Sequence, residues 1–126
     1  VDSALEDTNG KLIWDKPAVL KRVGGKEKRL VKLVGLFFSA MPDRMTALQQ
    51  AVDDENVEEI LHLAHSIKGV VANLGGLCME EAALELETAV KNNEMSSIER
   101  HMKQVDEAYD ALTHCISSSD LNAAEK

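Results

Sequence analysis

The sequence predicts an all-α protein: an antiparallel four-helix bundle with a short additional N-terminal helix covering one end. The composition is 44% apolar but only 3% aromatic, with seven glycines and two prolines, and an aliphatic core of this kind favours helix over sheet. Apolar residues recur in steps of three and four through most of the chain, which is the spacing of one helix face. The 126 residues suit one domain with one core.

The first expected helix is short. Asp15 can cap its start, Pro17 falls in its first turn, and Gly24 and Gly25 end it. The next helix carries its apolar stripe at positions 30, 34, 37, 41, 45, 48 and 52. Pro42 interrupts this stripe, and because proline removes a backbone donor we expect a kink or a break near Ala40 and Met41.

Three further helices follow. The first has apolar positions 57, 60, 64, 67, 71 and 74, begins with an apparent capping box of Asn56 and Glu59, and ends at Gly75 and Gly76. The next has positions 79, 82, 83, 86 and 90, and ends at residues 92 and 93. The last has positions 98, 102, 105, 109, 112 and 116, with residues 96 and 99 as its capping box. Each stripe can be buried against the others in a bundle.

The periodic sequence defines one domain. Residues 1–13 and 117–126 show no sustained period and are polar or small, so we expect an N-terminal tail or linker and a C-terminal tail around a bundle of residues 14–116.

Charge and composition exclude several classes of function. A formal charge of -8 argues against nucleic acid as a partner, because phosphate contacts need clustered basic residues. No apolar run approaches the length that crosses a bilayer. Cys78 and Cys115 lack metal-ligand spacing, which favours two buried or half-buried thiols in a reducing compartment. We therefore expect a cytoplasmic, monomeric domain without membrane contact of its own.

The stretch HSIKG, residues 65–69, is the chemical candidate. His65 falls outside the apolar stripe of its helix and therefore faces solvent. Glycine costs about 1 kcal/mol against alanine within a helix. Because helical side chains lean toward the N-terminus, residues 68 and 69 are the ones that can reach over residue 65. Gly69 leaves the imidazole uncovered, and Lys68 can bring an ammonium group close to a bound anion.

An exposed imidazole beside an ammonium group suits phosphoryl transfer. Imidazole is a nucleophile when it is neutral, and the chemistry otherwise needs positioning and charge stabilisation. The sequence indicates no general base, carboxylate dyad or metal cage around His65, so a partner is expected to supply the rest.

The segments AHSIKGVVANLGG, LELE and RVGGKEKRLVKLVGLF resemble a histidine-containing phosphotransfer (HPt) domain of bacterial phosphorelays, over roughly residues 14–116. HPt domains are often found at the C-terminus of hybrid sensor kinases, including those of the inner membrane. The resemblance implies that His65 is the phosphoacceptor, that Lys68 stabilises the phosphoryl group, and that Gly69 gives steric access.

The resemblance also implies the partners. The phosphoryl group would come from a receiver-domain aspartate of a response regulator and pass to another receiver, with Mg²⁺ supplied by the receiver. The chain would hold no cofactor or metal of its own and would have no autokinase or ATPase activity. Small residues usually follow the glycine in this family, whereas this chain has Val70 and Val71. Val70 can alter the rim of the docking surface, which we expect to comprise Leu61, His62, His65, Lys68, Gly69, Ala72 and Asn73.

Other functions remain as alternatives. A bundle that only binds a partner helix or a scaffold would show no phosphate chemistry. Glu59 and His62 have the Glu-x-x-His spacing of di-iron bundles, but those sites need two such pairs and two more glutamates facing inward. An autophosphorylating dimerisation domain would require a nucleotide site, and no glycine-rich nucleotide motif is present.

The charges are unevenly spread along the chain. Residues 11–32 hold eight of the 14 basic residues and two acidic ones, and acidic residues cluster at 53–59. The basic segment can steer an acidic receiver, or it can simply be a solvated face.

Overall fold

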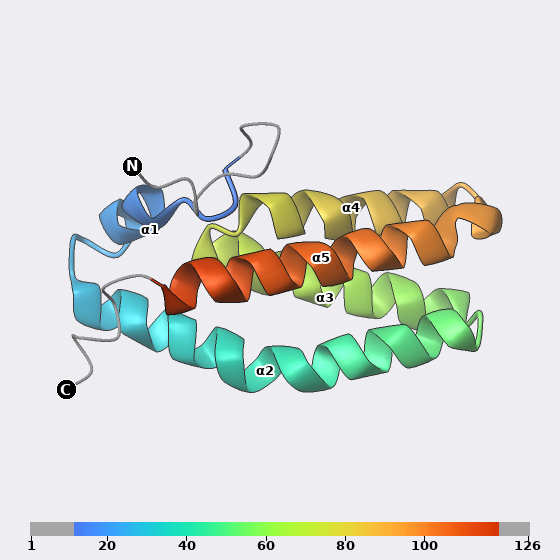
Figure 1. Ribbon diagram of the computed structural model, residues 1–126, viewed down its shortest axis with the longest axis horizontal. Helices are drawn as coiled ribbons and strands as arrows, with labels where there is room; N and C mark the ends of the chain where they lie inside the picture. The colour runs from blue at the N-terminus through green and yellow to red at the C-terminus, as the bar shows by residue number, and fades with distance from the viewer. Residues whose placement is uncertain (1–11, 119–126) are drawn as a thin grey trace.

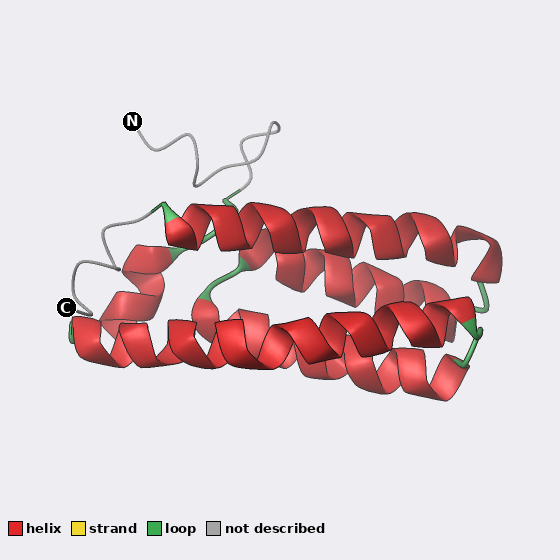
Figure 2. Ribbon diagram, turned by 60° about the horizontal axis from the view of Figure 1, so that its bottom comes forward, coloured by secondary structure: helices red, strands yellow, loops and turns green. Residues whose placement is uncertain are grey.

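The computed structural model describes residues 12–118 and has the predicted all-α architecture. Four long helices, α2 (Glu27–Asp53), α3 (Val57–Leu74), α4 (Leu77–Lys91) and α5 (Ile98–Ser117), lie side by side (Figure 1). The short helix α1 (Lys16–Arg22) lies at the end of the bundle where α2 begins and α3 ends. Short turns join the long helices at the two ends of the bundle (Figure 2), and a 3₁₀ turn, η2 (Met95–Ser97), precedes α5.

The segment before α1 is tied to the end of α3. Asp15 caps α1 by accepting a hydrogen bond from Ala18 N at 3.2 Å. The buried Trp14 indole donates to Leu74 O at 2.9 Å, and Asp15 N donates to Gly75 O at 2.8 Å. Ile13, which falls in the predicted N-terminal tail, is also buried, and Leu12 O accepts a hydrogen bond from Cys78 Sγ at 3.4 Å. Ser117, the first residue of the predicted C-terminal tail, is still part of α5. Residues 1–11 and 119–126 of the predicted tails lie outside the described residues.

Helix α2 runs without interruption through Pro42, so the predicted break is wrong. All seven predicted stripe positions of this helix are buried, on both sides of the proline. An interior proline costs about 3 kcal/mol, and burial of apolar side chains such as Phe37, Met41 and Met45 offsets that cost. The helix curves along its length in Figure 1.

The two predicted capping boxes fare differently. Asn56 caps α3 by accepting from Glu59 N at 3.3 Å, but Asn56 N donates to Ala51 O, so the reciprocal half of the box is absent. The box predicted at residues 96 and 99 is wrong. Ser97 occupies the N-cap position of α5 without a capping hydrogen bond, and its hydroxyl donates to Glu94 O at 2.8 Å.

The core follows the predicted stripes with two exceptions. Val57 is 39% exposed at the first position of α3, where no neighbouring turn covers it. Tyr109 is half-buried, and its ring lies tilted 5.9 Å from that of Phe37. Cys115 is buried and Cys78 half-buried, as predicted. Within residues 12–118, no helix is both long and apolar enough to cross a bilayer.

Candidate functional site

His65 stands on the solvent face of α3. The side chains of Ile60, Ala64, Ile67 and Val71 turn into the core, whereas the His65 side chain is 71% exposed. The predicted outward orientation is therefore confirmed. An incoming group can therefore reach the imidazole from solvent.

Gly69 has no structural reason to be glycine. It lies within regular helix, and a Cβ atom built at this position would meet nothing within 4 Å beyond the adjacent backbone of its own helix and its two chain neighbours. Neither backbone conformation nor packing requires it, although glycine weakens a helix interior. The open space above Gly69 lies one turn beyond His65, which fits the predicted role of steric access.

A buried carboxylate faces His65, contrary to expectation. The side chain of Glu87, on α4, is only 8% exposed, and its Oε2 lies 3.6 Å from His65 Nδ1. This separation is longer than a hydrogen bond, so the carboxylate lies next to the imidazole without a direct hydrogen bond to it. The sequence carried one signal of this residue: Glu87 lies on the apolar face of α4, between the buried residues Ala83 and Val90.

Glu87 also pairs with two lysines. Lys68 Nζ lies 3.2 Å from Glu87 Oε1, and Lys91 Nζ lies 3.4 Å from Glu87 Oε2. Burial acts to raise the pKa of Glu87, but the hydrogen bonds and attraction of Lys68 and then Lys91 outweigh it, and the pKa is lowered. Lys68 was expected to extend over His65 toward a bound anion. In this structure its ammonium contacts Glu87 instead.

The ionised form of Glu87 should stabilise the fold. Because the pKa of the carboxyl is lower in the folded protein, this stabilisation is present above the unfolded-state pKa and is lost as pH falls through the folded one. We expect Glu87→Gln to reduce the free energy of unfolding by about 1 kcal/mol at pH 7. The difference should shrink as pH falls below about 4.5, the ordinary pKa of a glutamate carboxyl, as measured by urea unfolding at each pH. Glu85→Gln, at an exposed position of the same helix, is the matched control and should change the free energy of unfolding by no more than about 0.5 kcal/mol.

The other residues of the predicted docking surface lie on α3 beside His65. His62 and Asn73 are exposed, and Leu61 and Ala72 are half-buried. Helix α1 reaches this surface, since Arg22 Nη2 donates to Asn73 O at 3.3 Å. The predicted surface is therefore continuous along the helix and is bordered by a cation at its C-terminal end.

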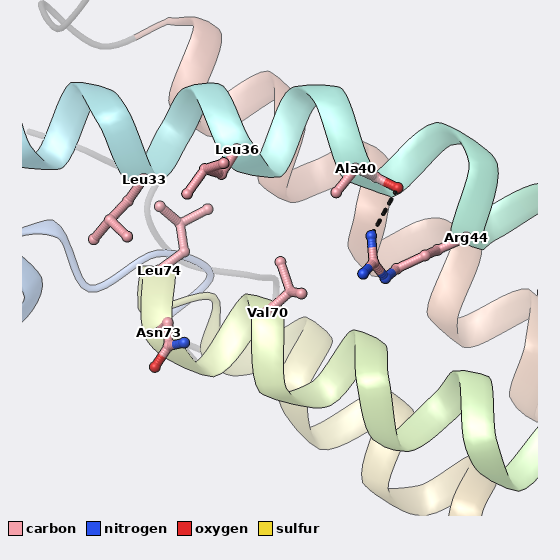
Figure 3. A pocket seen from close by; sticks show the side chains of 7 residues that line it. All are labelled: Leu33, Leu36, Ala40, Arg44, Val70, Asn73 and Leu74. Atoms are coloured by element: carbon pink, nitrogen blue, oxygen red, sulfur yellow. Dashed lines mark hydrogen bonds between the residues drawn. The ribbon is translucent and has the colours of Figure 1, made fainter.

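A pocket of about 250 Å³ adjoins this surface between α2 and α3. Figure 3 shows its lining of Leu33, Leu36, Ala40, Arg44, Val70, Asn73 and Leu74. Arg44 donates to Ala40 O at 3.3 Å and, through Nε, to Ser66 Oγ at 3.1 Å. Val70, the residue at which the chain departs from the family pattern, thus contributes to an apolar hollow next to Gly69.

Metal ligation has little support in the described part of the chain. Glu59 and His62 are both exposed. Residues 12–118 contain no group of three or more His, Cys, Asp or Glu side chains that could hold a metal ion.

Substitutions at Gly69 separate access from stability. Gly69→Ala should raise the free energy of unfolding by about 0.5–1 kcal/mol and leave the rate of phosphoryl transfer nearly unchanged, since a methyl group reaches no neighbour. Gly69→Tyr should slow transfer about tenfold or more, because the ring lies over His65 and displaces the phosphodonor. Transfer from a phosphorylated receiver and urea unfolding measure the two effects. Equal transfer rates in all three proteins would exclude the steric argument.

A comparison with protein-family models identifies the family of this helical bundle. The model of the Hpt domain matches residues 32–115, which include His65, Lys68, Gly69 and Glu87. Comparison with curated proteins and with solved structures gave no match. The family match covers about two thirds of the chain, and the helical bundle with its exposed histidine agrees with it. The chain therefore belongs to the Hpt domain family.

Proposed function

We propose that this chain is a phosphorelay intermediate that reversibly carries a phosphoryl group on His65. The Hpt family implies histidine phosphotransfer in phosphorelays. The finer proposal is that His65 accepts the group from a receiver-domain aspartate and passes it to the aspartate of another receiver. The observation that carries the proposal is the pairing of an exposed imidazole with the buried Glu87 carboxylate.

The position of Glu87 supports different roles for the two ring nitrogens. Nδ1 faces Glu87 Oε2, and a carboxylate favours the tautomer in which that nitrogen carries the proton. Nε2 then keeps its lone pair and is the nucleophile. Glu87 thus acts as a positioning residue for His65.

The phosphoryl transfer step needs no general base from this chain. The Nε2 lone pair forms the phosphorus–nitrogen bond, and the phosphorus–oxygen bond of the aspartyl phosphate breaks with its electron pair on the aspartate oxygen. The Nδ1 proton stays in place, and in the reverse direction the ring leaves as neutral imidazole. Lys68 offsets the charge of the transferring group.

The partner would complete the site. A receiver brings the aspartate, its acidic pocket and the Mg²⁺ ion, so this chain needs no cofactor of its own and no autokinase or ATPase activity. Docking would use the surface around His65, with the basic residues of α1 and the start of α2 attracting the acidic receiver. We expect the domain to act as a monomer in the cytoplasm, either alone or as part of a sensor kinase.

The test is transfer of labelled phosphate. A receiver phosphorylated with ³²P on its aspartate should label the chain within minutes, and the label should be lost in acid, because a phosphorus–nitrogen bond is acid-labile whereas a phosphoserine ester at Ser66 is not. An unlabelled chain would favour a bundle that only binds a scaffold. Acid-stable label would assign the phosphate to a hydroxyl group instead.

A further inference from the structure

Lys91 reaches the His65 site from a different helix than Lys68 does. Its ammonium lies 3.4 Å from Glu87 Oε2, the same oxygen that faces His65 Nδ1. Lys68 contacts the other carboxylate oxygen from α3. Ammonium groups from α3 and α4 therefore converge on the carboxylate of Glu87, which faces the imidazole.

We propose that Lys91 is a second phosphoryl-binding residue. Its ammonium contacts Glu87 in the unphosphorylated protein and moves to the phosphoryl group during transfer. This inference rests on the proposed function. The Lys91 side chain is 61% exposed, so packing does not prevent it from turning. Its contact with Glu87 keeps the ammonium close to the ring until the anionic group arrives.

Charge favours this exchange of partners. A phosphoryl group carries about 1.5 to 2 negative charges at neutral pH, whereas the Glu87 carboxylate carries one. In the transition state the charge is spread over three equatorial oxygens, more than a single lysine can contact. Lys68 and Lys91 can bind different oxygens of the same group, and the exchange itself makes or breaks no covalent bond.

Glu87 explains why two cations can lie together before a phosphodonor binds. Two neighbouring ammonium groups repel each other, and this repulsion would drive the exposed Lys91 away from the site. The buried carboxylate between them cancels the repulsion. Glu87 thus positions Lys91 as well as the imidazole.

The experiment uses phosphoramidate, a small phosphodonor that transfers its phosphoryl group to His65 and releases ammonia. It needs no docking surface, so its rate reports on the phosphoryl site alone. Lys91→Met removes the charge but keeps the length of the side chain, and Lys91→Arg keeps the charge. Lys103→Met, at an exposed lysine on α5, is the matched control. The initial rate of phosphohistidine formation is followed by ³¹P NMR.

We expect Lys91→Met to lower the initial rate on the order of threefold to tenfold, a moderate effect because the ammonium is exposed and screened. The loss should shrink at high salt, Lys91→Arg should restore the rate, and Lys103→Met should match the wild type. A merely structural role predicts none of these rate changes. Equal rates in wild type and Lys91→Met, or an Arg variant as slow as the Met variant, would overturn the inference alone. A wild-type chain that phosphoramidate does not label on His65 would overturn the proposed function as well.

Discussion

His65→Gln should abolish phosphoryl acceptance while changing the free energy of unfolding by no more than about 0.5 kcal/mol. The amide of glutamine is not a nucleophile toward phosphorus, so the loss of function is complete. The side chain at this position is largely exposed, so the fold does not depend on it. Labelling by a phosphorylated receiver measures phosphoryl acceptance, and urea unfolding measures the free energy of unfolding.

The matched control is His114→Gln on α5, an exposed histidine with no part in the proposed chemistry. It should accept label at the wild-type rate. Acid-labile label on the His65→Gln variant would show that another histidine is the acceptor. If the His65→Gln variant instead failed to fold, this result would contradict the exposed position of the His65 side chain.

The helices could be predicted because their boundaries and their buried faces depend on local sequence. The steps of three and four placed Leu30, Ile60, Leu86 and Val105 in the core. Asp15 and Gly75 marked helix ends for stereochemical reasons that act within a few residues. The exposure of His65 followed from the same periodicity.

Features that depend on tertiary contacts could not be predicted in the same way. Pro42 suggested a break because its local cost is large, but the burial of residues on both sides keeps α2 continuous. Glu87 was not predicted because its importance comes from residues 19 and 22 positions away, Lys68 and His65. Periodicity states which face a residue occupies. It does not state which side chain of another helix lies opposite.

Gly75→Ala should destabilise the protein by about 2–4 kcal/mol, the largest loss of stability that we expect from a single methyl group. Gly75 has φ +83°, and a Cβ atom there would lie 2.5 Å from Val19 Cγ2 and 3.0 Å from Asp15 O. The added methyl therefore strains the backbone and also pushes away α1, whose cap residue Asp15 is hydrogen-bonded to Gly75 O.

Two other glycines separate these effects. Gly24→Ala shares the positive φ of +74° but meets no atom within 4 Å, whereas Gly35→Ala has neither strain nor contact. We expect Gly24→Ala to cost about 1 kcal/mol and Gly35→Ala to stabilise the helix by about 0.5–1 kcal/mol, both measured by urea unfolding. The loss in free energy of unfolding for Gly75→Ala beyond that for Gly24→Ala then measures the contribution of the contact between α1 and the end of α3. If Gly75→Ala costs no more than Gly24→Ala, α1 does not pack tightly against α3, and Arg22 is not held beside the docking surface.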